Sequence, residues 1–392
     1  MKKIRIGVIG LGWRSGVAHY WHRPEGRSVV VAGADIDPAR WDKFRQRVNP
    51  DADVMNDYRA LLERQDIDAV AIMTPDYCHA EHAVAALRAG KHVYCEKPLG
   101  ITVEECDRIL EAWRASGKHF MIGFNMRYMN MYRTMKEIID SGAIGEVKAV
   151  WVRHFVGLGS DYYYHSWHGS SRNTTSLLLQ KASHDIDMIH WLAGRYTEKV
   201  VAFGGVDYFG GSKPNDLICP ECPERESCPE ARFGPLVQCA FREEIDVEDN
   251  SMVLMELEGG IKASYMQCHF TPDYERNYTI IGTEGRIENN ETDNKVIVKN
   301  RKTNTWRELS DVVYDIKKAE GSHNGADQKI CDDFIAMLLD GKEPVAQPLA
   351  GRMSVAVGCA ATESMRSGGA VVRVKERQPW MTEDGAPLAR LS

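Results

Sequence analysis

A short apolar segment that runs into a glycine-rich turn constrains the fold of this chain more than any other feature. Residues 5–9 are typical of a buried β-strand, and the next residues are Gly10-Leu-Gly12-Trp-Arg-Ser15-Gly16. Glycines at the first two positions permit a tight turn and let the backbone approach a ligand closely. The third small position falls on Ser15, with Gly16 one residue later, so the spacing departs slightly from G-x-G-x-x-G. The pattern predicts a strand, a turn and a helix, which is how a dinucleotide-binding Rossmann fold begins.

The alternation of strand-like and helix-like segments continues as far as residue 125. Short β-rich apolar runs alternate with amphipathic stretches, which is the pattern of βαβ units around a parallel sheet. The expected strands cover residues 5–9, 29–34, 69–73, 92–94 and 120–122. Asp37-Pro38 can cap and begin one intervening helix, and Gly90 can end another over residues 79–89. Residues 1–125 are therefore predicted to form an α/β Rossmann domain with a doubly wound parallel sheet.

Beyond Gly145 the sequence alternates apolar and polar residues, as in strands with one solvated face. Strands are expected over residues 146–154, 199–203, 251–258, 261–268 and 370–374, with a hairpin turn at Glu258-Gly259-Gly260. Helices are expected over residues 175–192, 327–339 and 351–367. Residues 126–375 are thus predicted to form an α+β domain with a large open, mainly antiparallel sheet. A cysteine-rich insertion is expected at about residues 210–245, and residues 376–392 are predicted to be a loosely held tail.

Composition and charge narrow the class of partner. A chain of 392 residues exceeds the size of one hydrophobic core, which agrees with two domains. Its net charge of −7, with both signs mixed, offers no basic surface for nucleic acid. No apolar segment is long enough to span a membrane, and glycines interrupt the apolar run near the N-terminus. With ten cysteines and no secretion signal, the sequence predicts a cytoplasmic protein whose partner is a small molecule.

Asp35, at the end of the second predicted strand, discriminates between the two nicotinamide cofactors. A carboxylate at this position accepts the adenosine ribose hydroxyls and repels a 2′-phosphate. Asp37 competes for the role, but Pro38 follows it, and helix capping explains Asp37 without a ligand. The sequence therefore favours NAD over NADP. Thr74-Pro75 ends the third predicted strand at the same edge of the sheet, either beside the cofactor or only as a strand terminator.

Later motifs arrive in a fixed order. After Gly10-Leu-Gly12 come Glu96-Lys97-Pro98, then Gly123-Phe124-Asn125-Met126-Arg127-Tyr128, a helix with His184 and Asp187, and Gly282-Thr283-Glu284-Gly285. In these motifs the chain, from about residue 3 to about residue 375, resembles the Gfo/Idh/MocA oxidoreductase family. The resemblance implies a Rossmann domain and an α/β domain whose open sheet often mediates dimers or tetramers. It also implies NAD(P)-dependent oxidation or reduction of sugars and cyclitols by a homodimer or homotetramer.

The resemblance and the Rossmann pattern together indicate where the cofactor lies. Its contacts are expected from the glycine-rich turn, from the end of the second strand and from the loops at the carboxyl edge of the sheet. The expected residues are Gly10, Gly12, Trp13, Arg14, Ser15, Asp35, Thr74, Pro75, His79, Glu96, Lys97 and Asn125.

Lys97 matches the lysine of the family's E-K-P motif, which lies beside the nicotinamide and the reacting carbon–oxygen bond. A cation there stabilises a developing alkoxide, and burial can lower its pKa enough for proton exchange. The alternative is a salt bridge between Glu96 and a neighbour, with Lys97 solvated. The resemblance favours Lys97 as a catalytic residue.

His184 is the expected acid/base residue on the helix over residues 175–192. Imidazole can take the proton of a substrate hydroxyl near neutral pH, although a structural histidine is the alternative. At 100° per residue, Gln180, His184, Asp187 and Trp191 share one polar stripe of this helix.

The residues just before His184 depart from the best-known family members. Those members carry an aspartate where this chain has Gln180, which cannot accept a proton. Lys181 resembles a variant in part of the family and could orient a substrate hydroxyl or lower the pKa of His184. Alternatively, Lys181 is a solvated residue paired with Asp185 at i,i+4 spacing.

Residues suited to bind a sugar ring gather before this helix. Tyr162, Trp167, His168, Arg172 and Asn173 combine aromatic planes with hydrogen-bond donors, although a packed loop would also explain them. By the resemblance, Asn125 and Arg127 face the same crevice, with a structural ion pair as the alternative for Arg127. His323 adds either a substrate contact or a helix cap. The expected substrate-binding residues are Lys97, Arg127, Trp167, Arg172, Asn173, Lys181, His184 and His323.

Four cysteines form the densest thiol group of the sequence. Cys219, Cys222, Cys228 and Cys239 lie in the proline-rich insertion, and four thiolates suit tetrahedral zinc in a closed structural site. An iron–sulfur cluster also accepts four thiolates, and free thiols are a third alternative. The last spacing is long for a short zinc motif, so the sequence leaves the three alternatives open.

The sequence thus predicts an NAD-dependent dehydrogenase acting on a hydroxyl of a sugar, cyclitol or glycoside. A second hypothesis is an NAD-dependent glycosidase or lyase that oxidises a ring hydroxyl transiently, without net redox change. A third, from another class, is a non-catalytic NAD-binding sensor. The first two differ in whether reduced nicotinamide accumulates, and the third predicts that Lys97 is dispensable.

Overall fold

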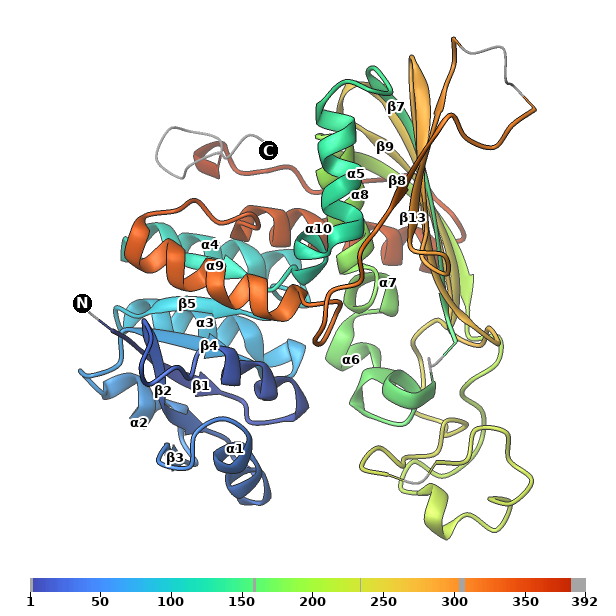
Figure 1. Ribbon diagram of the computed structural model, residues 1–392. Helices are drawn as coiled ribbons and strands as arrows, with labels where there is room; N and C mark the ends of the chain where they lie inside the picture. The colour runs from blue at the N-terminus through green and yellow to red at the C-terminus, as the bar shows by residue number, and fades with distance from the viewer. Residues whose placement is uncertain (1–2, 158–159, 233, 303–306, 382–392) are drawn as a thin grey trace. The chain divides into compact units, whose positions relative to one another are not determined.

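The computed structural model describes residues 3–157, 160–232, 234–302 and 307–381 (Figure 1). The chain forms two compact units. The first unit comprises residues 1–133, 318–355 and 377–392, and the second comprises residues 134–317 and 356–376. The sequence analysis assigned residues 126–375 to one domain, whereas residues 318–355 group with the first unit.

The first unit is built on a six-stranded sheet with the order β3-β2-β1-β4-β5-β6, in which every pair is parallel. This order and direction confirm the predicted doubly wound Rossmann fold. The strands are β1 (Ile4–Ile9), β2 (Ser28–Ala34), β3 (Asp53–Met55), β4 (Ala69–Ile72), β5 (His92–Cys95) and β6 (Phe120–Ile122). Among the strands of this sheet only the short β3 was not predicted, because its three residues are half-buried or exposed and form no apolar run.

Helices connect these strands, and local sequence explains where they begin and end. The helices are η1 (Trp13–Tyr20), η2 (Pro38–Arg40), α1 (Trp41–Arg47), α2 (Tyr58–Glu63), η3 (Asp76–Cys78), α3 (His79–Arg88), α4 (Val103–Ser116) and η4 (Asn125–Tyr128). Asp37 accepts a hydrogen bond from Ala39 N at 3.0 Å, which confirms its role as a helix cap. Thr102 caps α4 in the same way, and Gly117 ends it with φ +62°.

A helix from the C-terminal part of the chain completes the core of the first unit. Helix α9 (Ala326–Asp340) packs against η1 and η4. The rings of Trp21, Tyr94 and Phe334 meet at centroid distances of 5.0–5.7 Å. Trp21 also donates its indole N–H to Cys331 O at 3.0 Å. Burial of these aromatic rings holds residues 318–355 to a sheet that is more than 200 residues away in sequence.

The second unit is built on a nine-stranded sheet with the order β14-β13-β12-β11-β7-β10-β9-β8-β15 (Figure 1). All pairs are antiparallel except β7 with β10, so the sheet is mixed and mainly antiparallel, as predicted. Its strands are β7 (Val147–Val156), β8 (Thr197–Gly205), β9 (Asn250–Leu257), β10 (Ile261–Cys268), β11 (Tyr274–Gly282), β12 (Gly285–Asn290), β13 (Lys295–Asn300), β14 (Val312–Asp315) and β15 (Val372–Arg373). The hairpin turn η8 (Glu258–Gly260) lies where it was predicted.

The helix expected over residues 175–192 is two helices. Helix α7 (Leu177–Gln180) ends before Lys181-Ala182, and α8 (Ser183–Ala193) begins after them. Helix α8 packs on β7 and β10. Of the predicted polar stripe, Gln180, Asp187 and Trp191 are all buried. Only Lys181 and His184 at the helix start, and Ala193 at its end, are half-buried.

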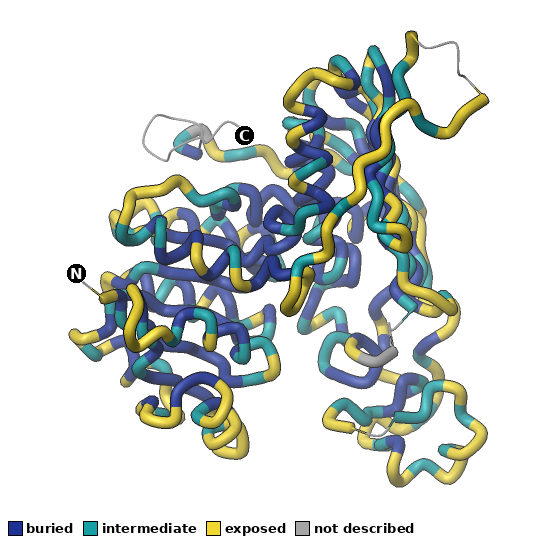
Figure 2. Tube along the Cα trace, viewed as in Figure 1, coloured by how far each residue is buried: buried dark blue, intermediate teal, exposed yellow. Residues whose placement is uncertain are grey.

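The remaining helices of the chain are short, or are divided between the two units. The short ones are η5 (Ser160–Tyr164), η6 (Trp167–Gly169), α6 (Ser171–Thr174), η7 (Cys219–Glu221) and η9 (Pro379–Met381). Helices α5 (Asn130–Asp140) and α10 (Pro348–Arg366) each contribute residues to both units. Figure 2 shows buried backbone along the strands of the first sheet and exposed backbone in the connecting loops.

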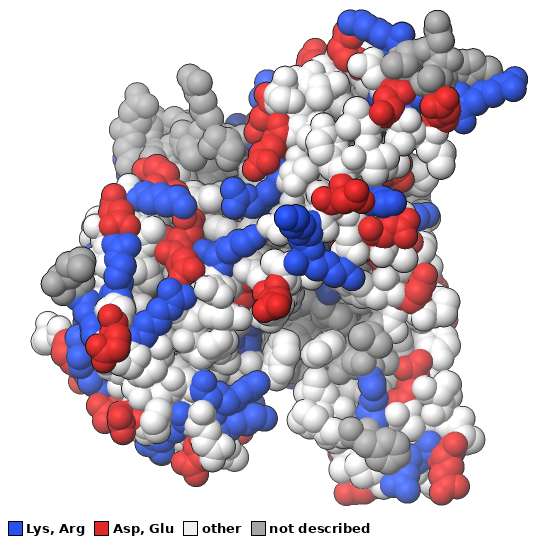
Figure 3. Space-filling view, in the orientation of Figure 1, with Lys and Arg blue, Asp and Glu red and all other residues white. Residues whose placement is uncertain are grey.

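Charge is mixed on the molecular surface. On the face shown in Figure 3, lysines and arginines alternate with aspartates and glutamates, and no single sign dominates. Within the described ranges, no helix is both long and apolar enough to cross a membrane.

A buried carboxylate anchors α8 to the second sheet. Asp185 is fully buried and lies 3.0 Å from Arg276 Nε on β11 and 3.1 Å from His154 Nδ1 on β7. Tyr265 and Tyr278 donate their hydroxyl hydrogens to the same carboxylate. Burial alone would raise the pKa of Asp185, but Arg276 and His154 outweigh it and hold the pKa well below its ordinary value. The alternative in which a solvated Lys181 pairs with Asp185 is therefore wrong, because Asp185 lies in the core.

Replacing this carboxylate tests the anchor. Asp185→Asn leaves the Arg276 guanidinium buried without its counter-charge, and we expect a loss of about 3 kcal/mol in the free energy of unfolding of the second unit. Urea unfolding followed by circular dichroism measures it. Glu256→Gln is the matched control, because Glu256 pairs with Lys199 at a surface position where both side chains are at least a third exposed. Equal midpoints for the two variants would contradict the anchoring role.

Candidate active site

The glycine-rich turn follows β1, next to β4, where the strand order of the first sheet reverses. Gly10 has φ +87°, and a Cβ there would lie 2.7 Å from Thr74 N, so only glycine fits. A Cβ on Gly12 would make an ordinary van der Waals contact with Arg40 Nη1 at 3.6 Å and would meet no other atom within 4 Å, so the described side chains do not crowd this position. Ser15 is buried and donates its hydroxyl to Gly12 O at 2.7 Å, so it closes the turn on itself.

Asp35 follows β2 at the same edge and is tied to the turn. Its carboxylate accepts hydrogen bonds from Leu11 N at 2.7 Å and from Asp37 N at 2.9 Å. Arg40 Nη1 lies 3.3 Å from Asp35 and Arg40 Nε lies 3.2 Å from Asp37, so two carboxylates share one guanidinium. A carboxylate can accept up to about four hydrogen bonds, so Asp35 retains capacity for a hydroxyl ligand.

Two large apolar side chains beside these residues are exposed. Trp13 is 68% exposed at the start of η1, and Ile36 is 88% exposed directly after Asp35. Both residues border the edge of the sheet at which the glycine-rich turn and Asp35 lie.

An ionic network behind the turn joins four distant segments of the first unit. Arg14 donates to Glu96 Oε1 at 2.7 Å and makes two bonds to Asp327, at 2.9 and 3.0 Å. Asn125 Nδ2 donates to the same carboxylate at 3.0 Å, and His323 Nδ1 lies 2.8 Å from it. Asp327 is fully buried. The role of Asp327 was not predicted, because its partners lie up to 313 residues away in sequence. An aspartate near a helix start also has ordinary explanations, such as helix capping.

This network includes several residues that were expected at the cofactor or substrate. Arg14 and Glu96 were expected to contact the cofactor, and the Arg14 guanidinium pairs with both Glu96 and Asp327. The salt bridge that was the alternative for Glu96 is present. His323 pairs with Asp327 at the start of α9, which agrees with the alternative that His323 caps this helix region. Arg127 was expected at the substrate, but it is buried and donates to Val345 O at 2.6 Å, so it supports the fold of the first unit.

His79 lies beneath the loops rather than at their surface. It is fully buried, and its two ring nitrogens lie 2.7 Å from Pro98 O and 2.9 Å from Thr74 O. Burial opposes protonation, but the Cys95 thiol, the Asp76 carboxylate and the Pro98 carbonyl raise the pKa of His79 above its ordinary value. An imidazolium that donates to both carbonyls joins the Thr74-Pro75 loop to the loop after β5. His79, expected among the cofactor-binding residues, has both ring nitrogens engaged with backbone carbonyls.

Lys97 follows β5 at the same edge of the sheet. It is half-buried, whereas its neighbours Glu96 and Pro98 are buried, so the ammonium group is the ionisable group of this loop nearest to solvent. Gly10, Asp35, Thr74 and Lys97 follow strands β1, β2, β4 and β5, and parallel strands present their carboxyl ends at one edge.

In the second unit, Lys181 and His184 flank the start of α8. The ammonium group of Lys181 lies 5.4 Å from the ring centre of Tyr163 and 6.0 Å from that of Tyr274. Cation–π contact with two rings fixes the direction of this side chain. His269, which sequence analysis missed, is buried against the ring of Tyr163 at 5.2 Å. Lys181, Tyr163 and His269 therefore form one cluster beside His184.

The segment before α8 holds the other expected substrate residues. The rings of Trp167 and His168 stack at 3.7 Å, and Asn173 Nδ2 donates to Trp167 O at 3.0 Å. Tyr162 and Arg172 are exposed, whereas Trp167, His168 and Asn173 are half-buried. Trp167 and His168 lie on η6, Arg172 and Asn173 lie on α6, and Tyr162 lies on the preceding η5. The side chain of Asn173 is partly used to hold the segment itself.

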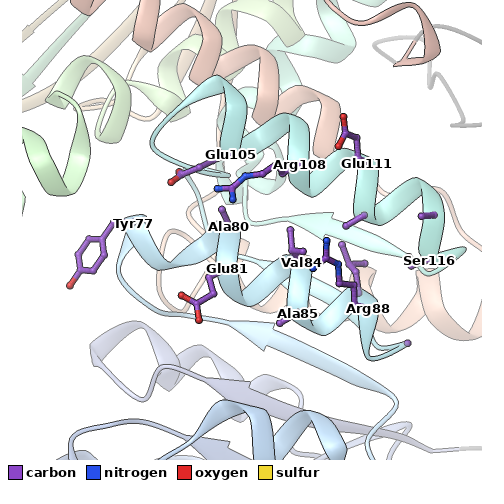
Figure 4. Close-up of a pocket in the computed structure, with 14 residues that line it drawn as sticks. Tyr77, Ala80, Glu81, Val84, Ala85, Arg88, Glu105, Arg108, Glu111 and Ser116 are labelled. Carbon is purple, nitrogen blue, oxygen red and sulfur yellow. The ribbon is translucent and has the colours of Figure 1, made fainter.

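A groove of about 970 Å³ lies elsewhere on the first unit, between α3 and α4 (Figure 4). Figure 4 shows Tyr77, Glu81, Glu105 and Arg108 around it. None of the residues expected around the cofactor lines this groove. It belongs to the helical layer and not to the loops that follow the strands.

The first unit is thus a dinucleotide-binding domain of the Rossmann class. Comparison with known protein families then shows to which family the chain belongs. The model of an oxidoreductase family, NAD-binding Rossmann fold, matches residues 4–124, and the C-terminal alpha/beta domain of the same family matches residues 136–374. The chain belongs to the Gfo/Idh/MocA oxidoreductase family, and the resemblance found in its motifs is confirmed.

Individual relatives agree with this assignment. The chain is 28% identical to the putative oxidoreductase YteT of Bacillus subtilis over 374 residues, covering 83% of this chain and 86% of that protein. It is 35% identical to inositol 2-dehydrogenase of Salmonella typhimurium over 192 residues, which cover 48% of this chain and 54% of the relative.

Solved structures share the fold. A levoglucosan dehydrogenase in complex with NADH and levoglucosan has a TM-score of 0.78 at 22% identity, covering 96% of this chain and all of the other. A scyllo-inositol dehydrogenase from Lactobacillus casei with bound NAD(H) and scyllo-inositol has a TM-score of 0.70 at 22% identity, covering 95% and 99%.

Asp327 offers a test of the ionic network. Hydrogen bonds from His323 and Arg14 outweigh the effect of burial and hold the pKa of Asp327 well below its ordinary value. Asp327→Asn should therefore cost about 2–3 kcal/mol of unfolding free energy at neutral pH. A depressed carboxyl pKa stabilises the fold above the unfolded-state pKa of about 4, so the deficit of the variant should shrink as pH falls below that value.

Thermal unfolding across pH measures this effect. Asp332→Asn is the matched control, because Asp332 lies on the same helix in an exposed pair with Arg23. A deficit for Asp327→Asn that is absent at pH 7, or that grows on acidification, would contradict the network.

Proposed function

We propose that this chain is an NAD-dependent dehydrogenase that transfers hydride between a secondary hydroxyl of a sugar, cyclitol or glycoside and the nicotinamide. The observation that carries the proposal is the alignment of Gly10, Asp35 and Lys97 at one edge of the first sheet. Membership of an oxidoreductase family with an NAD-binding domain supports the redox chemistry.

The residues at the glycine-rich turn fit NAD. Gly12 leaves space for close approach of a pyrophosphate, and Asp35 can accept hydroxyls of the adenosine ribose. Arg40, which lies beside Asp35, could attract a 2′-phosphate, but it already pairs with Asp35 and Asp37. Trp13 and Ile36 provide apolar surface for the planar parts of the cofactor. We therefore propose NAD rather than NADP.

Lys97 and His184 are proposed as the catalytic residues. A bound nicotinamide would supply the acceptor for the hydride. His184 would take the proton of the substrate hydroxyl, since imidazole titrates near neutral pH. The Lys97 ammonium would stabilise the negative charge that develops on the substrate oxygen. Lys181, held over Tyr163 and Tyr274, would bind a further hydroxyl.

The substrate class follows from the relatives and from the segment before α8. The names of the relatives include inositol 2-dehydrogenases, and a solved structure of the same fold holds levoglucosan. Trp167 and His168 offer aromatic planes, and Arg172 offers exposed donors, which suits a polyhydroxylated ring. We propose a small carbohydrate or cyclitol as the substrate.

We also propose that the chain forms a homo-oligomer through the second sheet. Phe203 pairs with Met252 on adjacent strands, and both side chains are more than half exposed. Leu254 and Trp151 lie in one row on either side of Ser264 and are 62% and 58% exposed. Such an apolar patch is typical of a protein interface. All ten cysteines are free thiols, which suits a reducing compartment such as the cytoplasm.

A substrate screen tests the proposed function. The full chain with NAD⁺ is assayed against monosaccharides, inositols, anhydrosugars and glycosides, with reduced nicotinamide and glycoside cleavage both followed. We expect reduced nicotinamide to accumulate in step with one oxidised product. Product release without reduced nicotinamide would favour the glycosidase or lyase hypothesis. Gln180, which replaces the aspartate of the best-known family members, is the reason to test that hypothesis. Neither signal with any polyol would favour the NAD-binding sensor.

Substitution of the two catalytic residues gives a quantitative prediction. Lys97→Met and His184→Asn should each lower kcat by about 10²–10⁴-fold, the usual contribution of charge stabilisation or of a general base. Lys118→Met and His119→Asn are controls on the first unit, and neither lies at the carboxyl edge of the sheet. Steady-state kinetics on the best substrate from the screen measures the effect. Retention of near-normal kcat by either catalytic variant would remove that residue from the mechanism.

A further inference from the structure

Four cysteines and one histidine of the second unit line a single small cavity. Cys219, Cys222, Cys228, Cys239 and His165 surround a space of about 20 Å³. Cys219 and Cys239 are buried, Cys222 and Cys228 are half-buried, and all four are free thiols. This cavity belongs to the insertion between β8 and β9 and contains none of the residues proposed for catalysis.

The backbone of the insertion brings the thiols together. Cys219 N donates to Val237 O at 2.8 Å and Cys239 N donates to Leu217 O at 2.9 Å, across a bridge between Ile218 and Gln238. This pairing sets Cys219 opposite Val237 and Cys239 opposite Leu217, so the two cysteines lie diagonally across the bridge on one of its faces. A turn closed by Cys222 N and Cys219 O at 3.2 Å then folds Cys222 back toward them. The spacing between Cys228 and Cys239 is long for a short zinc motif, but the local backbone pairing returns Cys239 to the strand segment that carries Cys219.

His165 adds an unusual group to the wall of the cavity. It is 1% exposed, and its Nδ1 lies 2.5 Å from Gln238 O and 3.9 Å from Cys219 Sγ. A ring whose Nδ1–H donates to a backbone carbonyl carries its lone pair on Nε2. The Glu230 backbone also lies close to the His165 ring, so the ring is held between two backbone segments of the insertion.

The insertion needs a stabilising element that its own packing does not supply. Between residues 205 and 250 the only regular element is the three-residue η7, as far as the structure describes this stretch. A long segment without secondary structure is uncommon in a compact domain, and small modules of this kind are commonly held by disulfides or metal. No described cysteine forms a disulfide here.

We propose that Cys219, Cys222, Cys228 and Cys239 bind one structural Zn²⁺ ion as a closed set of four thiolates. Among the described residues, no group of three or more His, Cys, Asp or Glu side chains is placed to hold a metal ion, so the proposal requires the four sulfur atoms to move to about 2.3 Å from the ion. Four protein ligands leave no open position for a substrate, so the ion is structural. His165 then lies in the outer shell, against the ligand Cys219.

The ion would also hold the segment before α8. Arg242, which is fully buried, donates to Cys239 O at 3.0 Å, to Tyr164 O at 2.5 Å and to Ser166 O at 2.8 Å. Asp246 accepts from both Ser171 N and Ser171 Oγ at 2.6 Å. The insertion therefore supports the backbone on either side of Trp167. This part of the inference rests on the proposed function, whereas the metal site itself does not.

Metal content tests the proposal without reference to activity. The full chain, expressed with zinc and iron both supplied, is purified without chelator and analysed by plasma mass spectrometry. We expect about one zinc ion per chain, as for a closed four-cysteine site. Cys219→Ser and Cys228→Ser should lose at least nine-tenths of it. Cys78→Ser, a half-buried thiol of the first unit, is the matched control and should retain it. Iron with acid-labile sulfide in place of zinc would overturn the assignment of the metal.

A second measurement covers the case in which the serine variants fail to fold. Wild-type chain is titrated with p-hydroxymercuribenzoate, and released metal is followed with a chromogenic chelator, while cobalt-substituted chain is examined for thiolate-to-cobalt absorption. We expect release in step with thiol modification and a strong charge-transfer band. His165→Ala should keep its metal, and loss of metal from this variant would overturn the four-thiolate ligand set. Wild-type chain that holds no metal and takes up no cobalt would overturn the proposal entirely.

Discussion

The buried carboxylate of Asp327 is the interaction on which the cofactor edge of the first unit depends. A carboxylate without solvent must be paired, and here its partners come from the glycine-rich turn, the loop after β6 and the segment before α9. Arg14 extends the pairing to Glu96 after β5. Loops that would otherwise be independent are therefore held in one arrangement, at the place where the strand order of the sheet reverses.

The second unit also depends on a buried carboxylate with several partners. Asp185 is buried in α8 and is satisfied by Arg276, His154 and two tyrosines of the sheet. In both units the proposed catalytic residue is the immediate neighbour of such a carboxylate, since Lys97 follows Glu96 and His184 precedes Asp185. The buried neighbour fixes the backbone, while the catalytic side chain keeps partial exposure. Rigid placement of half-exposed ionisable groups is what a dehydrogenase site requires.

Local patterns in the sequence were enough to predict most of the framework. The strands of the first sheet, the need for glycine at position 10 and the cap at Asp37 each depend on neighbours within a few residues or on a known turn. What could not be predicted depends on distant pairing. Asp327, His269 and the engagement of Arg14 are visible only once segments hundreds of residues apart are in contact. The break between α7 and α8 was missed because Lys181 and Ala182 both have good helix propensity.

The central claim is that the edge of the first sheet, with Asp35 at its end, binds NAD. Titration calorimetry of the wild-type chain with NAD and with NADP tests it most directly. The arrangement of Asp35, Asp37 and Arg40 predicts that NAD binds at least about tenfold more tightly, a difference of about 1.4 kcal/mol. Asp35→Ser should narrow this difference, whereas Lys118→Met should preserve it. Equal or tighter binding of NADP by the wild-type chain, or no binding of either cofactor, would contradict the account.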